Sequence, residues 1–275
     1  MKIHHLNCGS VRQIEATYDG PPAAHAVNHC LLVETDTDGL ILVETGLGLG
    51  DIANPGDTLG AEWVAMAEPL LSEEETAVRQ VSALGYAARD VRHVVVTHLD
   101  VDHCGGLPDF PDAQVHVLAA ELAAAMAEAP SFRYRPAHWA HGPKWVSYEQ
   151  AVQEWFGFGS APLKGVEADI RLVPLGGHTA GHTGVAVRDG DHWLLHCGDA
   201  YYYHRELASD SHPHPILDIV QTRSEVHHDL RVGTQARLRE LVRNHGDEVS
   251  VFCAHDPWEL SRHLEDARYL TLPST

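Results

Sequence analysis

The feature that most constrains this chain is a dense cluster of metal-ligand side chains directly after a run of three valines. Residues 97–106 read THLDVDHCGG, so two histidines and two aspartates occupy six positions. In an extended segment residues i and i+2 point to the same side, and His98 and Asp100 can therefore converge on one ion. If the chain then turns, Asp102 and His103 can hold a second ion nearby, and the two glycines that follow let the backbone pass close to it. The segment predicts two metals rather than one.

Size and charge narrow the classes of function. The chain has 275 residues, of which 44% are hydrophobic, and no repeat or linker divides it, so we expect residues 1–275 to form a single domain. The 39 acidic side chains against 19 Lys and Arg give a net charge of −20, which repels a nucleic-acid backbone. The N-terminus lacks the pattern of a signal peptide, and no apolar run reaches about 18 residues. We therefore expect a cytoplasmic protein that contacts neither nucleic acid nor membrane.

The five cysteines are widely scattered and form no CxxC pair, which argues against a disulfide framework and against a structural zinc knuckle. We expect free thiols that are mostly buried. Cys104 differs from the others because it directly follows His103, where it could meet a metal or an oxidant.

Hydrophobic patterning predicts a β-rich half, helices, and a second β-rich half with helices, which suggests two similar layers that close on each other. A helix is expected from a capping box at 72–75 to about 84–85. A second helix is expected at 119–129 and a third at 223–244, with a long loop at 130–146. The expected strands are 29–34, 40–44, 91–97, 114–118, 170–174, 184–188, 192–196 and 249–254, and an Asp/Gly turn at 35–39 joins the first two as a hairpin.

Polar residues follow three of the later strands. The sequence reads GGH at 176–178, CGD at 197–199 and AHD at 254–256. Because chemistry in α/β folds usually lies at the carboxyl ends of strands, these positions can supply further ligands.

Together, the motifs THLDVDHCGG, GGHTAGH, CGDA and CAHDP resemble, in order and spacing, those of the metallo-β-lactamase superfamily of metal-dependent hydrolases. The resemblance implies a four-layer αββα sandwich in which helices flank two mixed β-sheets. It also implies a first metal bound by His98, Asp100 and His178, a second bound by Asp102, His103 and His255, and Asp199 as a bridge between them.

This chain departs from the family pattern HxHxDH because Asp100 stands where the second histidine is expected. Asp100, Asp102, Asp199 and a bridging hydroxide would balance the four charges of two divalent ions, giving zero where HxHxDH gives plus one. The ions would then be weaker Lewis acids, and manganese or iron would compete better with zinc, which remains the default. The alternative is that Asp100 is not a ligand and that the first site is weak or empty.

Two other positions need an assignment. His182 is a rival to His178 as ligand, but the GHTxGH pattern of the family favours His178 and places His182 behind the site. Glu44 stands where the family commonly has aspartate before Thr-Gly, and we expect it to orient the ligands.

Hydrolysis is the reaction that the resemblance implies, with a metal-bridging hydroxide as nucleophile. Asp102 or Asp199 could relay its proton to the leaving group. Tyr202, three residues past Asp199, resembles the oxyanion-stabilising tyrosine of N-acyl homoserine lactonases, which favours a lactone or related ester of a small molecule. Packing of three adjacent tyrosines around a cleft is the alternative. Glyoxalase II-like thioester hydrolysis, a di-iron redox role and a non-catalytic binding protein remain as other hypotheses.

The segment 131–145 concentrates cationic and aromatic side chains in an acidic chain. Arg133, Arg135 and Trp139 could line the pocket and meet an anionic or aromatic substrate, although such loops often fold over a core instead. Trp63, Met66 and Leu70 could form another apolar wall, although amphipathic core packing is the favoured explanation for them. The expected partner is a small-molecule substrate, and homodimer formation is left open.

Overall fold

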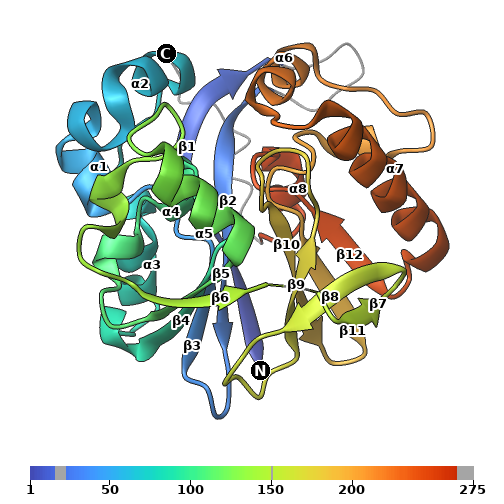
Figure 1. Ribbon diagram of the computed structural model, residues 1–275, viewed down its shortest axis with the longest axis horizontal. Helices are drawn as coiled ribbons and strands as arrows, with labels where there is room; N and C mark the ends of the chain where they lie inside the picture. The colour runs from blue at the N-terminus through green and yellow to red at the C-terminus, as the bar shows by residue number, and fades with distance from the viewer. Residues whose placement is uncertain (16–22, 150, 265–275) are drawn as a thin grey trace.

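Two six-stranded β-sheets face each other, and helices cover their outer faces (Figure 1). The computed structural model describes residues 1–15, 23–149 and 151–264. This is the four-layer αββα arrangement that the sequence predicts.

The first sheet is antiparallel at one edge and parallel at the other. Its order is β1-β2-β3-β4-β5-β6, with β1 to β3 antiparallel and β3 to β6 parallel. The predicted hairpin joins β2 to β3, and Thr35 N–H donates to the Gly39 carbonyl across its turn (3.2 Å). The strands are β1 (Lys2–Ile14), β2 (Ala24–Glu34), β3 (Leu40–Val43), β4 (Val91–Val95), β5 (Gln114–Leu118) and β6 (Lys144–Tyr148).

The second sheet is antiparallel except at one edge, where β11 and β12 run parallel. Its order is β12-β11-β10-β9-β8-β7. The strands are β7 (Gln153–Trp155), β8 (Phe158–Pro162), β9 (Ile170–Pro174), β10 (Thr183–Asp189), β11 (His192–His196) and β12 (Val249–Phe252).

The helices α1 to α5 lie on the side of the first sheet, and α6 and α7 lie on the side of the second (Figure 1). In the described residues the α-helices are α1 (Leu49–Ala53), α2 (Ala61–Ala67), α3 (Ala77–Ala83), α4 (Val101–Cys104), α5 (Ala119–Glu128), α6 (Pro215–Ser224), α7 (His228–His245) and α8 (Pro257–Ser261). None of the helices in this part of the chain has both the length and the apolar character needed to cross a membrane.

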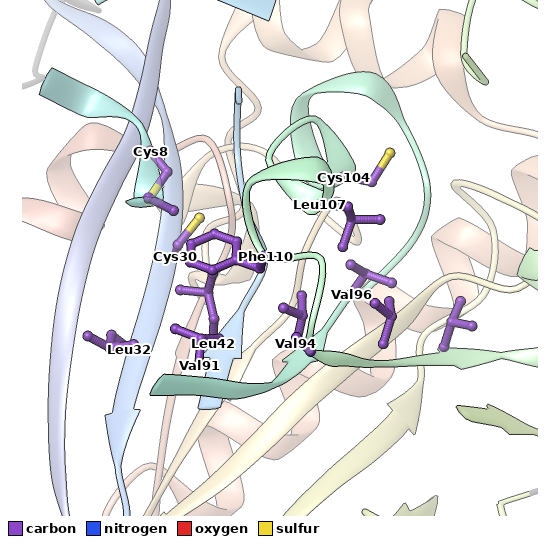
Figure 2. Close-up of a cluster of buried hydrophobic side chains, with 14 of the residues drawn as sticks. Cys8, Cys30, Leu32, Leu42, Val91, Val94, Val96, Cys104, Leu107 and Phe110 are labelled. Carbon is purple, nitrogen blue, oxygen red and sulfur yellow. The ribbon is translucent and has the colours of Figure 1, made fainter. Parts of the chain in front are cut away.

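Strand β3 is apolar at every position because both of its faces are buried. Ile41 and Val43 point into the core between the two sheets, whereas Leu42 points outward and packs under the helices. A strand covered on both faces has no solvent side and needs no polar alternation. Figure 2 shows Leu42 together with Val94 and Phe110 in the hydrophobic cluster between the first sheet and its helices, which we call the outer cluster.

The expected capping box at 72–75 is wrong, although the helix ends where expected. Glu73–Glu75 form a 3₁₀ turn, Ser72 makes no side-chain cap, and α3 begins only at Ala77. The Glu75 carboxylate instead accepts hydrogen bonds from the Ser10 backbone N–H (2.6 Å) and hydroxyl (3.1 Å). This tertiary contact with β1 competes with the local cap.

The helix expected at 223–244 is present as α7, which begins later, at His228, and the patterning missed the preceding helix α6. The chain breaks between α6 and α7 because Val226 N–H and His227 N–H both donate to the Gly177 carbonyl (2.9 Å each). The break fastens the end of α6 to the loop that carries His178. The expected loop at 130–146 is also partly wrong, since β6 begins at Lys144, and the patterning missed β1, β7 and β8.

The prediction of free, buried thiols is confirmed for all five cysteines. Cys104 is fully buried; its thiol donates to the Leu99 carbonyl (3.3 Å) and lies 3.6 Å from His138 Nδ1. It therefore helps to pack the ligand loop and does not face solvent.

The carboxyl group of Glu259 on α8 gives the fold a pH dependence that can be measured. It is buried, it accepts hydrogen bonds from the Tyr201 hydroxyl (2.9 Å) and Cys253 N–H (2.8 Å), and burial raises its pKa to about 8. The folded chain thus holds a proton that the unfolded chain releases near its ordinary pKa. We expect the free energy of unfolding to fall as pH rises from about 4.5 to 8, by up to about 1.4 kcal/mol per pH unit. Urea titrations of Glu259→Gln should show a flatter slope across this window; an unchanged slope would contradict the assignment.

Candidate metal centre

The candidate ligands lie at strand ends that the fold brings together. His98 follows β4, Asp199 follows β11, and His255 follows β12, while His178 lies in the loop between β9 and β10. The two sheets supply different members of the set. The site is therefore assembled only when both sheets are in place.

Two groups of side chains could each hold a metal ion. In the first, His98, His178 and Asp199 each offer a ligand atom, and these atoms lie within 4.8 Å of one another. In the second, Asp102, His103 and His255 do the same. We call these the first and second clusters. The sequence predicted two sites from the same strand ends, and the structure brings these six residues together.

Asp199 faces both clusters. Its Oδ2 lies 3.4 Å from His178 Nε2 and 3.9 Å from His98 Nε2, whereas its Oδ1 lies 3.2 Å from both His103 Nε2 and His255 Nε2. Burial alone would raise the pKa of Asp199, but the surrounding histidines lower it well below its ordinary value. An ionised carboxylate with one oxygen toward each cluster has the geometry expected of a bridge.

The turn expected after Asp100 is the one-turn helix α4. The Asp100 carbonyl accepts hydrogen bonds from His103 N–H (3.0 Å) and Cys104 N–H (3.1 Å), and this turn brings Asp102 and His103 to the second cluster, with the centroid of the His103 ring 3.9 Å from that of the His98 ring. The glycines that follow were expected to approach an ion. They contact the chain after β3 instead: a Cβ at Gly105 would lie 2.2 Å from Asp51 Oδ2.

Three of the histidines are oriented by hydrogen bonds at the nitrogen that points away from the clusters. His98 Nδ1 lies 2.8 Å from Thr97 Oγ1, and His255 Nδ1–H donates to the Val27 carbonyl (2.9 Å). His103 Nδ1–H donates to Glu44 Oε2 (2.6 Å), and Thr97 N–H donates to Glu44 Oε1. Protonation at Nδ1 leaves the lone pair of Nε2 free for a metal, so Glu44 lies where an orienting role requires it.

His182 lies behind the first cluster. Its Nδ1–H donates to the Leu175 carbonyl (2.7 Å), and its Nε2 accepts from Asp199 N–H (2.9 Å). Burial lowers the pKa of His182 to about 3, so the ring is neutral. With both nitrogens engaged by backbone, His182 has no lone pair for an ion, whereas His178 Nε2 belongs to the cluster. Gly198 permits the close approach, because a Cβ there would lie 2.7 Å from His182 Nε2.

The residues present fit a pair of divalent ions. His98 Nε2, His103 Nε2 and Asp199 Oδ1 are buried and make no hydrogen bond within the described residues. Buried polar atoms are normally paired, so lone pairs that converge without protein partners suit a bound cation. Imidazole and carboxylate donors without thiolate suit zinc, manganese or iron.

Asp100 lies beside the first cluster. Its Oδ2 is 3.2 Å from His178 Nε2 and 3.5 Å from His98 Nε2, and its buried Oδ1 makes no hydrogen bond to the described part of the chain. The same Oδ2 accepts a hydrogen bond from Arg133 Nη1 at 2.6 Å. The sequence contained no signal for this ion pair. Because Asp100 Oδ2 already accepts a hydrogen bond from Arg133, the ligand role of Asp100 stays a prediction.

A cavity of about 610 Å³ opens above the clusters. Asp100, Asp102 and His255 form part of its lining, together with Tyr202, whose hydroxyl donates to Asp199 Oδ2 (2.6 Å) and whose ring stacks on His255. Burial and the Asp199 charge raise the pKa of Tyr202 well above its ordinary value, so its hydroxyl keeps its proton. The walls are mostly apolar: Val11, Ile14, Ala26, Trp63, Met66, Ala67, Val101, Phe132, Ile216, Leu217, Ile219 and Val220.

The 131–145 segment contributes less to this cavity than expected. Arg133 lines it, but Arg135 and Trp139 are absent from the lining formed by the described residues. Arg135 lies against Gly60, where a Cβ would be 1.8 Å from its Nη2, and Trp139 packs against the outer cluster of the first sheet. Arg135 and Trp139 therefore fit the alternative expectation, in which the segment folds over a core and does not line the pocket.

Sequence reasoning missed Glu121 on α5. Its carboxylate accepts hydrogen bonds from Leu99 N–H (3.0 Å) on one ligand loop and from Thr179 Oγ1 (2.5 Å) and Gly181 N–H (3.1 Å) on another. It thereby fixes His98 and His178 relative to each other. The available signal was weak: an acidic residue one helical turn before Ala125, on the buried face of an alanine-rich helix.

Glu44→Gln should weaken the second cluster. The variant keeps the shape of the side chain but not the charge that holds His103 Nδ1–H, so we expect its metal affinity to fall about 10- to 100-fold, as is usual when such a partner is lost. Chelator competition measures this. Glu34→Gln is the matched control, because Glu34 also lies 2.5 Å from a histidine nitrogen, that of His4, outside both clusters. Equal affinities in the two variants would refute the role of Glu44.

Known proteins share both the sequence and the fold. The chain is 41% identical over 269 residues to a probable metallo-hydrolase of Mycobacterium tuberculosis, covering 95% of this chain and 83% of that protein. It is 33% identical to an N-acyl homoserine lactonase of a Bacillus species, covering 82% of this chain and 80% of the lactonase.

Among solved structures, an N-acyl homoserine lactone hydrolase with the product N-hexanoyl-L-homoserine at its catalytic metal center superposes with a TM-score of 0.68. The sequence identity is 20%, and 93% of each chain is covered, so this likeness supports the fold. The family model described as the metallo-beta-lactamase superfamily matches residues 26–255, a span that contains both clusters. The chain belongs to the metallo-beta-lactamase superfamily.

Proposed function

We propose that this protein is a dinuclear metal-dependent hydrolase that cleaves a lactone or ester of a small molecule. The observation that carries the proposal is the position of Asp199, with one carboxylate oxygen toward each ligand cluster at the floor of a mostly apolar cavity. The 33% identity to an N-acyl homoserine lactonase supports the lactone class.

In this proposal His98, Asp100 and His178 hold the first ion and Asp102, His103 and His255 hold the second, with Asp199 shared. Two divalent ions, zinc in the first instance, supply Lewis acidity and make water a nucleophile near neutral pH. The nitrogen and oxygen donors also accept manganese or iron.

Protein side chains beside the clusters would transfer the proton and stabilise the oxyanion. Asp102 and Asp199 are the carboxylates placed to take a proton from water and deliver it to the leaving group. Tyr202 keeps its proton and points at the same place, so its hydroxyl can leave Asp199 and donate to the oxygen that becomes negative in the transition state.

The cavity walls favour a substrate with an apolar chain. Trp63 and Met66 on α2 and Ile219 on α6 face the same space as the clusters, so a hydrocarbon chain can leave water while the carbonyl group lies at the floor. The cations Arg12 and Arg223 also line this space and could meet a polar end of the molecule.

Metal analysis and an activity screen test the proposal together. We expect the purified protein to bind two divalent ions per chain and to hydrolyse lactones that carry an apolar chain faster than thioesters, phosphodiesters or β-lactams. Removal of the ions with a chelator should abolish the activity and their return should restore it. A protein with two bound ions and no turnover of lactones or esters would contradict the proposal, and preference for thioesters would favour the glyoxalase II-like alternative.

Tyr202→Phe should lower kcat by about 100-fold and change KM little, because one donor to the developing oxyanion is lost while the apolar ring remains. Tyr201→Phe is the matched control. The Tyr201 hydroxyl donates to Glu259 and is not part of the cavity lining among the described residues, so kcat should stay near the wild-type value. Unaltered kcat in Tyr202→Phe would remove this residue from the mechanism.

A further inference from the structure

Arg133 brings a fixed positive charge to the first cluster. Its Nη1 donates to Asp100 Oδ2 (2.6 Å) and lies 3.1 Å from His178 Nε2, the nitrogen that belongs to the cluster. The guanidinium is therefore next to the position that an ion held by His98 and His178 would take.

The side chain is held at more than one point. Arg133 Nη2 donates to the Ser224 carbonyl at the end of α6, and the side chain is only 16% exposed. Ser224 is also the residue after which the chain breaks to contact Gly177, next to His178. The break between α6 and α7, the guanidinium and the first cluster thus form one connected unit.

The three carboxylates of the centre do not have equal surroundings. Asp102 and Asp199 have only histidines within ion-pair distance in the described part of the chain, whereas Asp100 is paired with an arginine. The positive guanidinium offsets part of the negative charge that Asp100 presents to an ion at the first cluster. Asp100 can therefore lend an oxygen lone pair to the first cluster without adding a full negative charge.

We propose that Arg133 is a positioning residue that cancels the charge of Asp100, weakens binding of a divalent ion to the first cluster, and so makes the second cluster fill first. This inference rests on the metal centre of the proposed function and adds the order in which it is loaded. In a site with three carboxylates, the arginine keeps the first ion from losing its Lewis acidity to excess negative charge. Lysine, a compact point charge, would not reproduce the two-armed contact with Asp100 and Ser224.

Zinc titration against a chromophoric chelator tests the proposal, with binding affinity as the readout. Wild-type protein should bind one zinc ion tightly and a second more weakly. Arg133→Met should tighten the weaker step by about tenfold or more, because a unit positive charge a few ångströms from a divalent ion is removed. Arg133→Gln keeps a hydrogen-bond donor without the charge. It should tighten the weaker zinc-binding step in the same way, and it replaces Arg133→Met if that variant does not fold.

Arg223→Met is the matched control. Arg223 lines the same cavity but has no ion pair to the described residues, so both zinc-binding steps should stay unchanged.

The double variant Asp100→His/Arg133→Met separates charge from packing. Histidine is neutral and still offers a lone pair, so the weaker step should return to within about threefold of the wild-type affinity. Unchanged zinc affinity in Arg133→Met and Arg133→Gln, or a decrease, would overturn the proposal. A wild-type protein that binds two zinc ions but shows no esterase activity would refute the proposed reaction and leave this inference standing. A wild-type protein that binds fewer than two ions would refute both.

Discussion

The structure depends on the placement of one buried carboxylate between two sets of imidazoles. Two backbone features allow Asp199 to face both clusters. Gly198 before it adopts a left-handed conformation, and the Asp199 N–H donates a hydrogen bond to His182 Nε2. A larger residue at 198 would collide with His182 and Thr97. The bridge is thus set by local backbone geometry at the end of β11, and the rest of the site is arranged around it.

The groups behind the ligands account for much of the buried polar content of this region. Glu44 orients His103, and Glu121 connects the His98 loop to the His178 loop. Asp51 Oδ1 lies 2.9 Å from His138 Nε2, and His138 contacts Cys104 at the end of α4. A set of buried charges of this kind is stable only when every member has a partner, which explains why the ligand loops are fastened from several sides.

The sequence predicted the parts of this site that depend on short-range order. The polar residues after the predicted strands pointed to a two-metal site, and the family resemblance assigned His98 and His178 to one ion and Asp102, His103 and His255 to the other. Apolar runs predicted β3, β4, β5 and β9 to β11. Contacts between distant segments left no periodic trace. The binding of Glu75 to Ser10, the docking of Val226 on Gly177 and the Arg133–Asp100 pair each join residues more than thirty positions apart. The single-domain assignment of residues 1–275, the small-molecule partner and the homodimer stay predictions.

The pair of Asp100 with Arg133 changes the interpretation of the charge in the first motif. An aspartate in place of a neutral ligand would leave the centre uncharged and its ions weakly acidic, but the arginine restores the missing positive charge beside the first cluster. The departure at Asp100 is therefore compatible with a hydrolytic centre. In the proposed reaction, the apolar walls of the cavity and its remaining cations would select the substrate.

The most direct test of the account is a crystal structure of the zinc-loaded protein with anomalous diffraction at the zinc edge. The account predicts two anomalous peaks about 3.5–4 Å apart, one at each cluster, with a different oxygen of Asp199 bound to each ion. A single peak, or two ions without Asp199 between them, would contradict it.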